Sequence, residues 1–218
     1  MTRIRSRFAL TEISLVVGVW AIVMWGVGAK WWTGFNSPDS QFSATLAIFG
    51  HSVHDRALDG SYYWTRLGYL APVHGLIKMF GIWAGFAIWR ALLLLLVVGA
   101  AYWLVRRLTG RALSVALAFF VALNTMVLSY LGNTYATGSA MAATFVVIAL
   151  GTSRLRAVPG RGYHLAQPIL IGLVFGWLVM LNPYNAMLAG FLWLGIRMVA
   201  WWVDRINALA LLRELLWI

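Results

Sequence analysis

Residues 164–203 read HLAQPILIGLVFGWLVMLNPYNAMLAGFLWLGIRMVAWWV, a run of 40 residues that is almost continuously apolar. The run is interrupted once, at Asn182-Pro183-Tyr184-Asn185. A helix needs about 20 apolar residues to cross a bilayer, and proline flanked by asparagine favours a turn. The run therefore predicts two membrane-spanning helices joined by a tight hairpin.

Upstream of this run, hydropathy predicts four further spans. They are placed at about residues 12–29, 85–105, 112–130 and 139–151. The whole chain is 62% apolar and 11% charged, with a mean hydropathy of +0.81, whereas soluble domains are about 45–50% apolar and about 25% charged. We expect an all-α polytopic membrane protein, a single transmembrane domain over residues 1–218 with about six transmembrane helices.

The same composition excludes several functional classes. It rules out a soluble enzyme, a disordered chain and an ordinary nucleic-acid-binding domain, so no nucleic acid partner is expected. The net charge of +11 instead indicates basic cytoplasmic loops. Because the chain has no cysteine, disulfides, thiol catalysis and Cys-ligated metals are excluded.

The arginines orient the chain in the membrane. Three segments that should face the same side carry three arginines each, at positions 3, 5 and 7, at 106, 107 and 111, and at 154, 156 and 161. The short turns around Asn133 and Asn182 carry no charge. By the positive-inside rule, the N-terminus is cytoplasmic in a multi-pass protein of the cell membrane. A signal peptide cleaved near Val27-Gly28-Ala29 is an alternative, and it leaves residues 30–81 outside as well.

The apolar tail 206–218 is too short to span and contains Arg213 and Glu214. It is expected to form an interfacial helix or to begin an unfinished seventh span.

Residues 30–81 form one large outer loop, which holds three of the six acidic residues and three of the four histidines. Ser37-Pro38-Asp39 has the residues of a helix start, and Phe42, Leu46 and Phe49 follow at helical spacing. Pro72 opens a second apolar periodicity that Gly81 ends. We expect two short amphipathic helices, over 38–49 and 72–80, lying along the outer membrane surface.

Two motifs in this loop resemble a known family. Ser37-Pro38-Asp39-Ser40 is similar to the acidic motif after the first span of the GT-C glycosyltransferases, and Ala71-Pro72-Val73-His74-Gly75-Leu76 resembles their proline-rich loop motif. The stretch 62–69 is similar to actinobacterial members. The resemblance implies an enzyme that moves a sugar from a polyprenyl-phosphate donor to an extracytoplasmic glycan, lipid or protein acceptor.

The resemblance also implies roles for individual residues. Asp39 is the general base on the acceptor hydroxyl, whereas the alternative is a carboxylate that only caps its helix. The candidate ligands of the donor phosphate are Lys78, Arg90 and Arg66. Arg90 otherwise snorkels to the headgroups, and Arg66, as an exposed arginine, otherwise pairs with Asp59. We expect Asp39, Lys78 and Arg90 to converge on one outward-facing cavity.

The candidate substrate-binding residues are His74, Tyr63 and Asn133. For His74 an ordinary surface-helix position is an equal alternative, and for Asn133 an ordinary turn is favoured. The resemblance implies a lipid-linked sugar as donor, and the sequence establishes no other cofactor. A divalent metal could bind His51, His54 and Asp55, although a solvated loop is the better explanation of this group.

The resemblance has one departure, because GT-C enzymes commonly have many more helices. The chain is then a fragment, a truncated product or a small relative that needs a partner subunit. The alternative function is a non-catalytic accessory subunit that docks through the outer loop. A small transporter is the weakest alternative, since the spans contain almost no acids or paired charges.

Overall fold

The computed structural model describes residues 2–27, 38–49, 66–106, 109–133, 136–152 and 166–204. Every regular element in these ranges is an α-helix, which confirms the predicted all-α class. In chain order the helices are α1 Thr2–Val27, α2 Pro38–Phe49, α4 Leu67–Phe80, α5 Ile82–Arg106, α6 Arg111–Leu123, α7 Thr125–Gly132, α8 Ala136–Thr152, α9 Ala166–Leu181 and α10 Pro183–Asp204.

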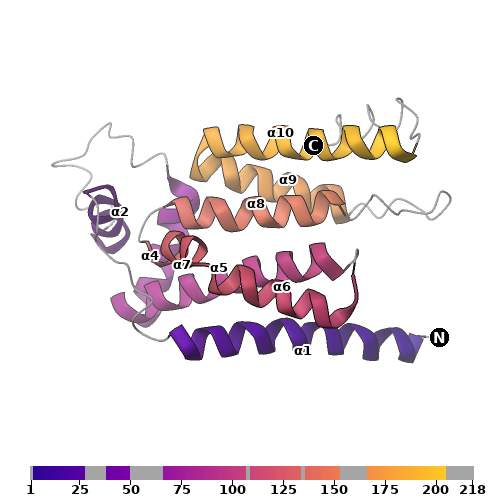
Figure 1. Cartoon of the computed structure of the whole chain (residues 1–218). Helices are drawn as coiled ribbons and strands as arrows, with labels where there is room; N and C mark the ends of the chain where they lie inside the picture. Colours follow the sequence, from indigo (N-terminus) through magenta and orange to yellow (C-terminus); the bar gives the residue numbers. More distant parts are fainter. Residues whose placement is uncertain are drawn as a thin grey trace.

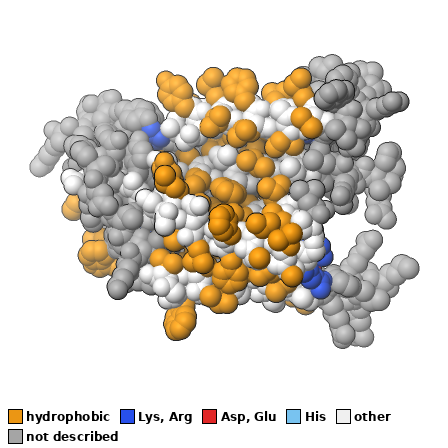
Figure 2. Space-filling view, in the orientation of Figure 1, with side chains coloured by type: hydrophobic (Ala, Val, Ile, Leu, Met, Phe, Trp, Pro, Cys, Tyr) orange, Lys and Arg blue, Asp and Glu red, His pale blue; other side chains and the backbone are white. Residues whose placement is uncertain are grey.

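Two of the described helices are long and apolar enough to cross a membrane, Leu10–Val27 within α1 and the whole of α5. The number rises to three if the bent pair α6 and α7 forms one span. Trp83 and Trp103 are exposed near the two ends of α5, where an aromatic belt is expected. Figure 2 shows hydrophobic side chains across the middle of one face, with Lys and Arg towards its two ends. This distribution is that of a membrane protein.

The helices form an elongated bundle in which α1 lies along one flank and α10 along the other (Figure 1). Helix α5 is central and packs against α4, α6 and α8. One end of the bundle gathers the N-terminus of the chain with the α5–α6 connection, and we call it the N-terminal end. The opposite end, which we call the α2–α4 end, carries α2, α4 and α7 (Figure 1).

The structure corrects the third predicted span. A single helix over 112–130 is wrong, because the chain breaks at Asn124 and α6 and α7 meet at 55°. The Asn124 side chain accepts hydrogen bonds from the backbone N–H groups of Met126 and Val127, at 3.0 and 3.3 Å. Asn124 therefore caps a new helix, which an average of hydropathy over the segment does not detect.

The start of the second loop helix is also corrected. Helix α4 begins at Leu67 rather than at Pro72, so Pro72 lies inside it. Proline lacks the N–H that would bond to the carbonyl of Gly68, four residues earlier. The indole N–H of Trp177 in α9 donates to that carbonyl at 2.9 Å. This bond from a neighbouring helix satisfies the carbonyl that Pro72 leaves without its helical donor.

Three other helix boundaries agree with those predicted from the sequence. Helix α2 covers the predicted 38–49, and Gly81 ends α4 with a φ of 85°, a conformation that favours glycine. Helices α9 and α10 meet at Asn182, whose side chain accepts from the N–H of Tyr184 at 3.0 Å. The predicted hairpin at Asn182-Pro183 is confirmed.

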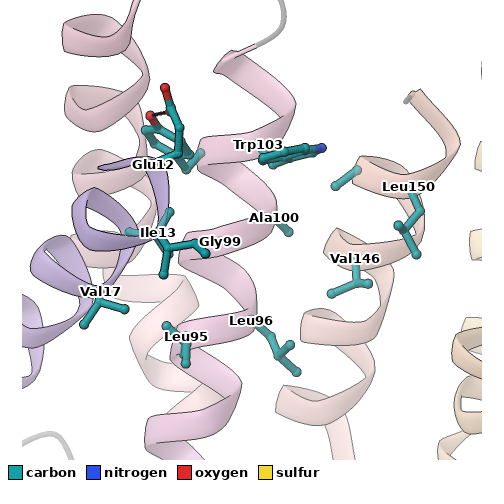
Figure 3. A pocket seen from close by; sticks show the side chains of 13 residues that line it. Glu12, Ile13, Val17, Leu95, Leu96, Gly99, Ala100, Trp103, Val146 and Leu150 are labelled. Carbon is teal, nitrogen blue, oxygen red and sulfur yellow. Dashed lines mark hydrogen bonds between the residues drawn. The ribbon is translucent and has the colours of Figure 1, made fainter. Parts of the chain in front are cut away.

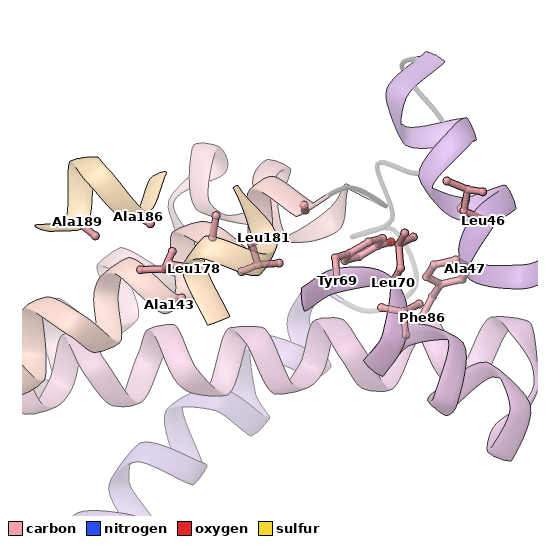
Figure 4. Close-up of a cluster of buried hydrophobic side chains, with 14 of the residues drawn as sticks. Leu46, Ala47, Tyr69, Leu70, Phe86, Ala143, Leu178, Leu181, Ala186 and Ala189 are labelled. Carbon is pink, nitrogen blue, oxygen red and sulfur yellow. The ribbon is translucent and has the colours of Figure 1, made fainter. Parts of the chain in front are cut away.

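A hydrophobic cluster at the α2–α4 end joins α2, α4, α5, α8, α9 and α10 (Figure 4). Its largest fully buried members include Tyr69, Phe86, Leu178 and Leu181. Helix α4 contributes Val73 and Ile77 to this cluster. Helix α4 is thus packed on protein along one side.

Candidate functional site

The candidate site lies at the α2–α4 end, where the two helices of the loop 30–81 pack together. His74 of α4 and the backbone carbonyl of Ala47 in α2 are 2.7 Å apart, joined through the imidazole Nδ1. Leu46 and Ala47 are buried in the same cluster as Tyr69 and Leu70 (Figure 4). Asp39 is in the first turn of α2, and its side chain lies outside the described part of the structure. His74 therefore fixes the helix that carries the candidate base.

Arg66 lies immediately before α4, and the structure corrects its expected exposure. The residue is only 3% exposed. Its Nη1 donates to the carbonyl of Leu181, the last residue of α9, at 2.8 Å. The last carbonyls of a helix have no partner within the helix, so the guanidinium caps α9 from α4. Asp59, its predicted ion-pair partner, lies outside the described residues.

Arg90 is likewise buried, at 5% exposure, and does not snorkel to the lipid surface. Its guanidinium carbon lies 6.0 Å from the centre of the Phe86 ring, at the outer limit of a cation–π contact. The Tyr69 phenol also interacts with it. Burial raises the pKa of Tyr69, so the phenol stays neutral beside the cation. Arg90 thus belongs to the packed interior beneath α4.

Lys78 is exposed in the last turn of α4, at the far end of that helix from Tyr69. The two residues are nine positions apart, which corresponds to about 13.5 Å along a helix axis. Arg90 interacts electrostatically with Tyr69, in the first turn of α4, whereas Lys78 is in the last turn of that helix. The convergence of Asp39, Lys78 and Arg90 on one cavity stays a prediction, since the Asp39 side chain lies outside the described part of the structure.

Two tryptophans lie in the layer beneath α4. Trp89 donates to the hydroxyl of Ser139 at 3.2 Å, and its ring meets that of Trp177 edge to face, with centres 6.3 Å apart. These contacts hold α5, α8 and α9 together.

Asn133, a candidate substrate-binding residue, follows the last residue of α7. Its backbone N–H donates to the carbonyl of Ser129 at 3.2 Å. The role of Asn133 in substrate binding stays a prediction.

The remaining candidates, Tyr63, His51, His54 and Asp55, lie outside the described residues. Within the described ranges, no group of three His, Cys, Asp or Glu side chains lies close enough to hold a metal ion.

Sequence reasoning missed a charged cluster at the N-terminal end of the bundle. The carboxylate of Glu12 in α1 accepts from the Tyr102 hydroxyl. It also pairs with Arg106 Nε at 3.3 Å and with Arg111 Nε at 2.7 Å. The cluster ties α1 to the end of α5 and the start of α6. The pattern that could have revealed this cluster in the sequence is an acidic residue in the first turn of one predicted span together with arginines at the end of another.

Sequence reasoning also passed over Arg197, a charged residue of α10 that is 3% exposed.

No family model matches the chain, and no curated protein or solved structure matches it either. The chemistry of the site is therefore argued from the residues of this chain.

Proposed function

We propose that the chain is a membrane glycosyltransferase of the GT-C type, or a truncated relative, that uses a polyprenyl-phosphate sugar. The observation that carries the proposal is the packing of α2 on α4, tied by the 2.7 Å contact between His74 and Ala47. This packing puts the first turn of α2, with Asp39, on a fixed support at one end of the bundle. A general base requires such a fixed position relative to its acceptor.

In the proposed reaction, Asp39 takes the proton of the acceptor hydroxyl. The acceptor oxygen forms a bond to the anomeric carbon as the bond from that carbon to the phosphate oxygen breaks, and the configuration inverts. The polyprenyl phosphate leaves with the electron pair. Exposed Lys78 is the described cation that remains available to the departing phosphate. Arg66 and Arg90 take the role of holding α4 on the bundle.

The alternative is a non-catalytic accessory subunit that docks through the outer loop. The burial of Arg66 and Arg90 favours this alternative. Buried arginines leave fewer cations to bind a donor phosphate than the sequence predicts. The assay that separates the alternatives measures release of polyprenyl phosphate, the product common to all acceptors, by the chain and by its Asp39→Asn variant. A transferase releases it and the variant does not, whereas an accessory subunit shows no difference.

We further propose six crossings in a multi-pass cell-membrane protein, with a cytoplasmic N-terminus and with α2 and α4 along the outer surface. The arrangement in Figure 1 supports this topology, since the described chain ends and connections alternate between the two ends of the bundle. Arg106 and Arg111 are at the N-terminal end, as the positive-inside rule requires of a cytoplasmic side.

Cysteine labelling tests this topology, and the absence of native cysteine gives a clean background. Ser52 and Ser153, both outside the described residues, are replaced singly by cysteine. We expect an impermeant maleimide added to intact cells to label Ser52→Cys and to label Ser153→Cys only after permeabilisation. Equal labelling of both in intact cells contradicts the topology.

A further inference from the structure

A cavity of about 770 Å³ opens between α1, α5 and α8 near the N-terminal end of the bundle. Its walls are almost wholly apolar, and they include Ile13 and Val17 from α1, Leu96 from α5 and Val146 from α8 (Figure 3). Ile13, Val17 and Leu96 are exposed. The groove therefore lies between the two helices that are long enough to cross a membrane, where lipid chains would surround it.

One end of this groove is polar. The Glu12 carboxylate lies there, with the Tyr102 side chain also in the lining (Figure 3). Arg106 and Arg111 hold this carboxylate at 3.3 and 2.7 Å, and their side chains keep 35% and 37% of their surface exposed. Trp103 lines the same end, and tryptophan favours the headgroup level of a bilayer.

The described charges at the polar end favour an anionic occupant with a single charge. Among the described side chains there, two guanidinium groups and one carboxylate leave a net charge of +1, which matches a phosphodiester with a charge of −1. A phosphate monoester such as a polyprenyl phosphate carries about −1.5 to −2 at neutral pH and fits less well. Arginine also binds phosphate oxygens with two parallel N–H groups. The elongated apolar walls suit an acyl chain.

We propose that this groove is a binding site for an anionic phospholipid, with an acyl chain between α1, α5 and α8 and the phosphodiester at Arg106 and Arg111. The site is at the end of the bundle opposite α2 and α4, so it is independent of the proposed transfer reaction. A bound lipid would fill the groove and link α1 to α8 across α5.

The test uses the full chain purified in mild detergent and titrated with phosphatidylglycerol or phosphatidylcholine, with bound lipid counted by native mass spectrometry. We expect phosphatidylglycerol to bind at least tenfold more tightly. Gly99→Phe should weaken this binding at least tenfold, because Gly99 lines the groove and a phenyl ring at this position would occupy the space proposed for the acyl chain. The matched control is Gly195→Phe in α10, where an added β-carbon meets no atom within 4 Å, and it should bind as the parent does.

A second variant distinguishes recognition of the lipid headgroup from binding of the acyl chain. Arg111→Gln keeps the groove but removes one cation, and it should reduce the preference for phosphatidylglycerol while leaving phosphatidylcholine binding unchanged. Equal binding of the two lipids by the parent chain overturns the proposal. So does undiminished binding by Gly99→Phe, tighter binding of a polyprenyl phosphate than of phosphatidylglycerol, or full competition by inorganic phosphate.

Discussion

Asp39→Asn should slow the release of polyprenyl phosphate by about 10²- to 10⁴-fold, the range that a general base contributes. The amide is nearly the same size as the carboxylate but cannot accept the acceptor proton. Asp39 is in the first turn of α2, where its charge adds a favourable interaction with the helix dipole of about 0.3–1 kcal/mol. The fold should therefore survive the substitution. The rate is measured with radiolabelled donor in proteoliposomes.

The matched control for this prediction is Asp204→Asn, the same chemical change in the last residue of α10. It is made at the other end of the bundle from α2 (Figure 1). We expect this variant to release polyprenyl phosphate at the parent rate. If Asp39→Asn also keeps that rate, or if both variants lose it equally, Asp39 is not the base.

The second large effect is expected at Gly85, where α5 lies against the backbone of α4. A β-carbon built on Gly85 would lie 2.7 Å from the backbone nitrogen of Ile77 and 2.8 Å from its Cα. Backbone atoms cannot move aside as the end of a flexible side chain can, so Gly85→Ala must push the two helices apart. Overpacking of this kind costs about 1–3 kcal/mol. The midpoint of thermal denaturation in detergent should fall by several degrees, at roughly 2–4 °C per kcal/mol for a chain of this size.

Gly75→Ala is the control for this substitution, because Gly75 lies in the same α4 and an added β-carbon there meets nothing within 4 Å. Alanine is favoured over glycine inside a helix by about 0.5–1 kcal/mol. The control should therefore denature at the parent temperature or slightly above it. Equal midpoints for Gly85→Ala and Gly75→Ala would show that α4 and α5 do not approach as closely as described.

Local sequence signals were sufficient where they act over a few residues. Pro38 and Asp39 predicted the start of α2, Gly81 predicted the end of α4, and Asn182-Pro183 predicted the turn between α9 and α10. Each of these signals fixes backbone conformation within about one helical turn. The break at Asn124 also has such a signal, an asparagine before threonine. A hydropathy average does not detect it, because the residues on both sides are apolar.

The burial of the cations could not be predicted in the same way. Arg66 is buried because α9 ends 115 residues further along the chain and presents the carbonyl of Leu181 to it. Helix α4 likewise continues upstream of Pro72 because Trp177, 109 residues from Gly68, satisfies the carbonyl that proline leaves. The Glu12 cluster also joins residues 90 or more positions apart. Such contacts depend on how the helices pack, which the spacing of residues along one segment does not determine.

Multiple turnover by the purified chain tests the proposed cleavage of a polyprenyl-phosphate sugar most directly. The chain is reconstituted alone in liposomes with polyprenyl-phosphate hexoses and pentoses, and a membrane extract supplies acceptors. We predict that at least one donor yields more than one mole of polyprenyl phosphate per mole of chain. Release no greater than that from empty liposomes, for every donor tested, contradicts the claim and favours the accessory subunit.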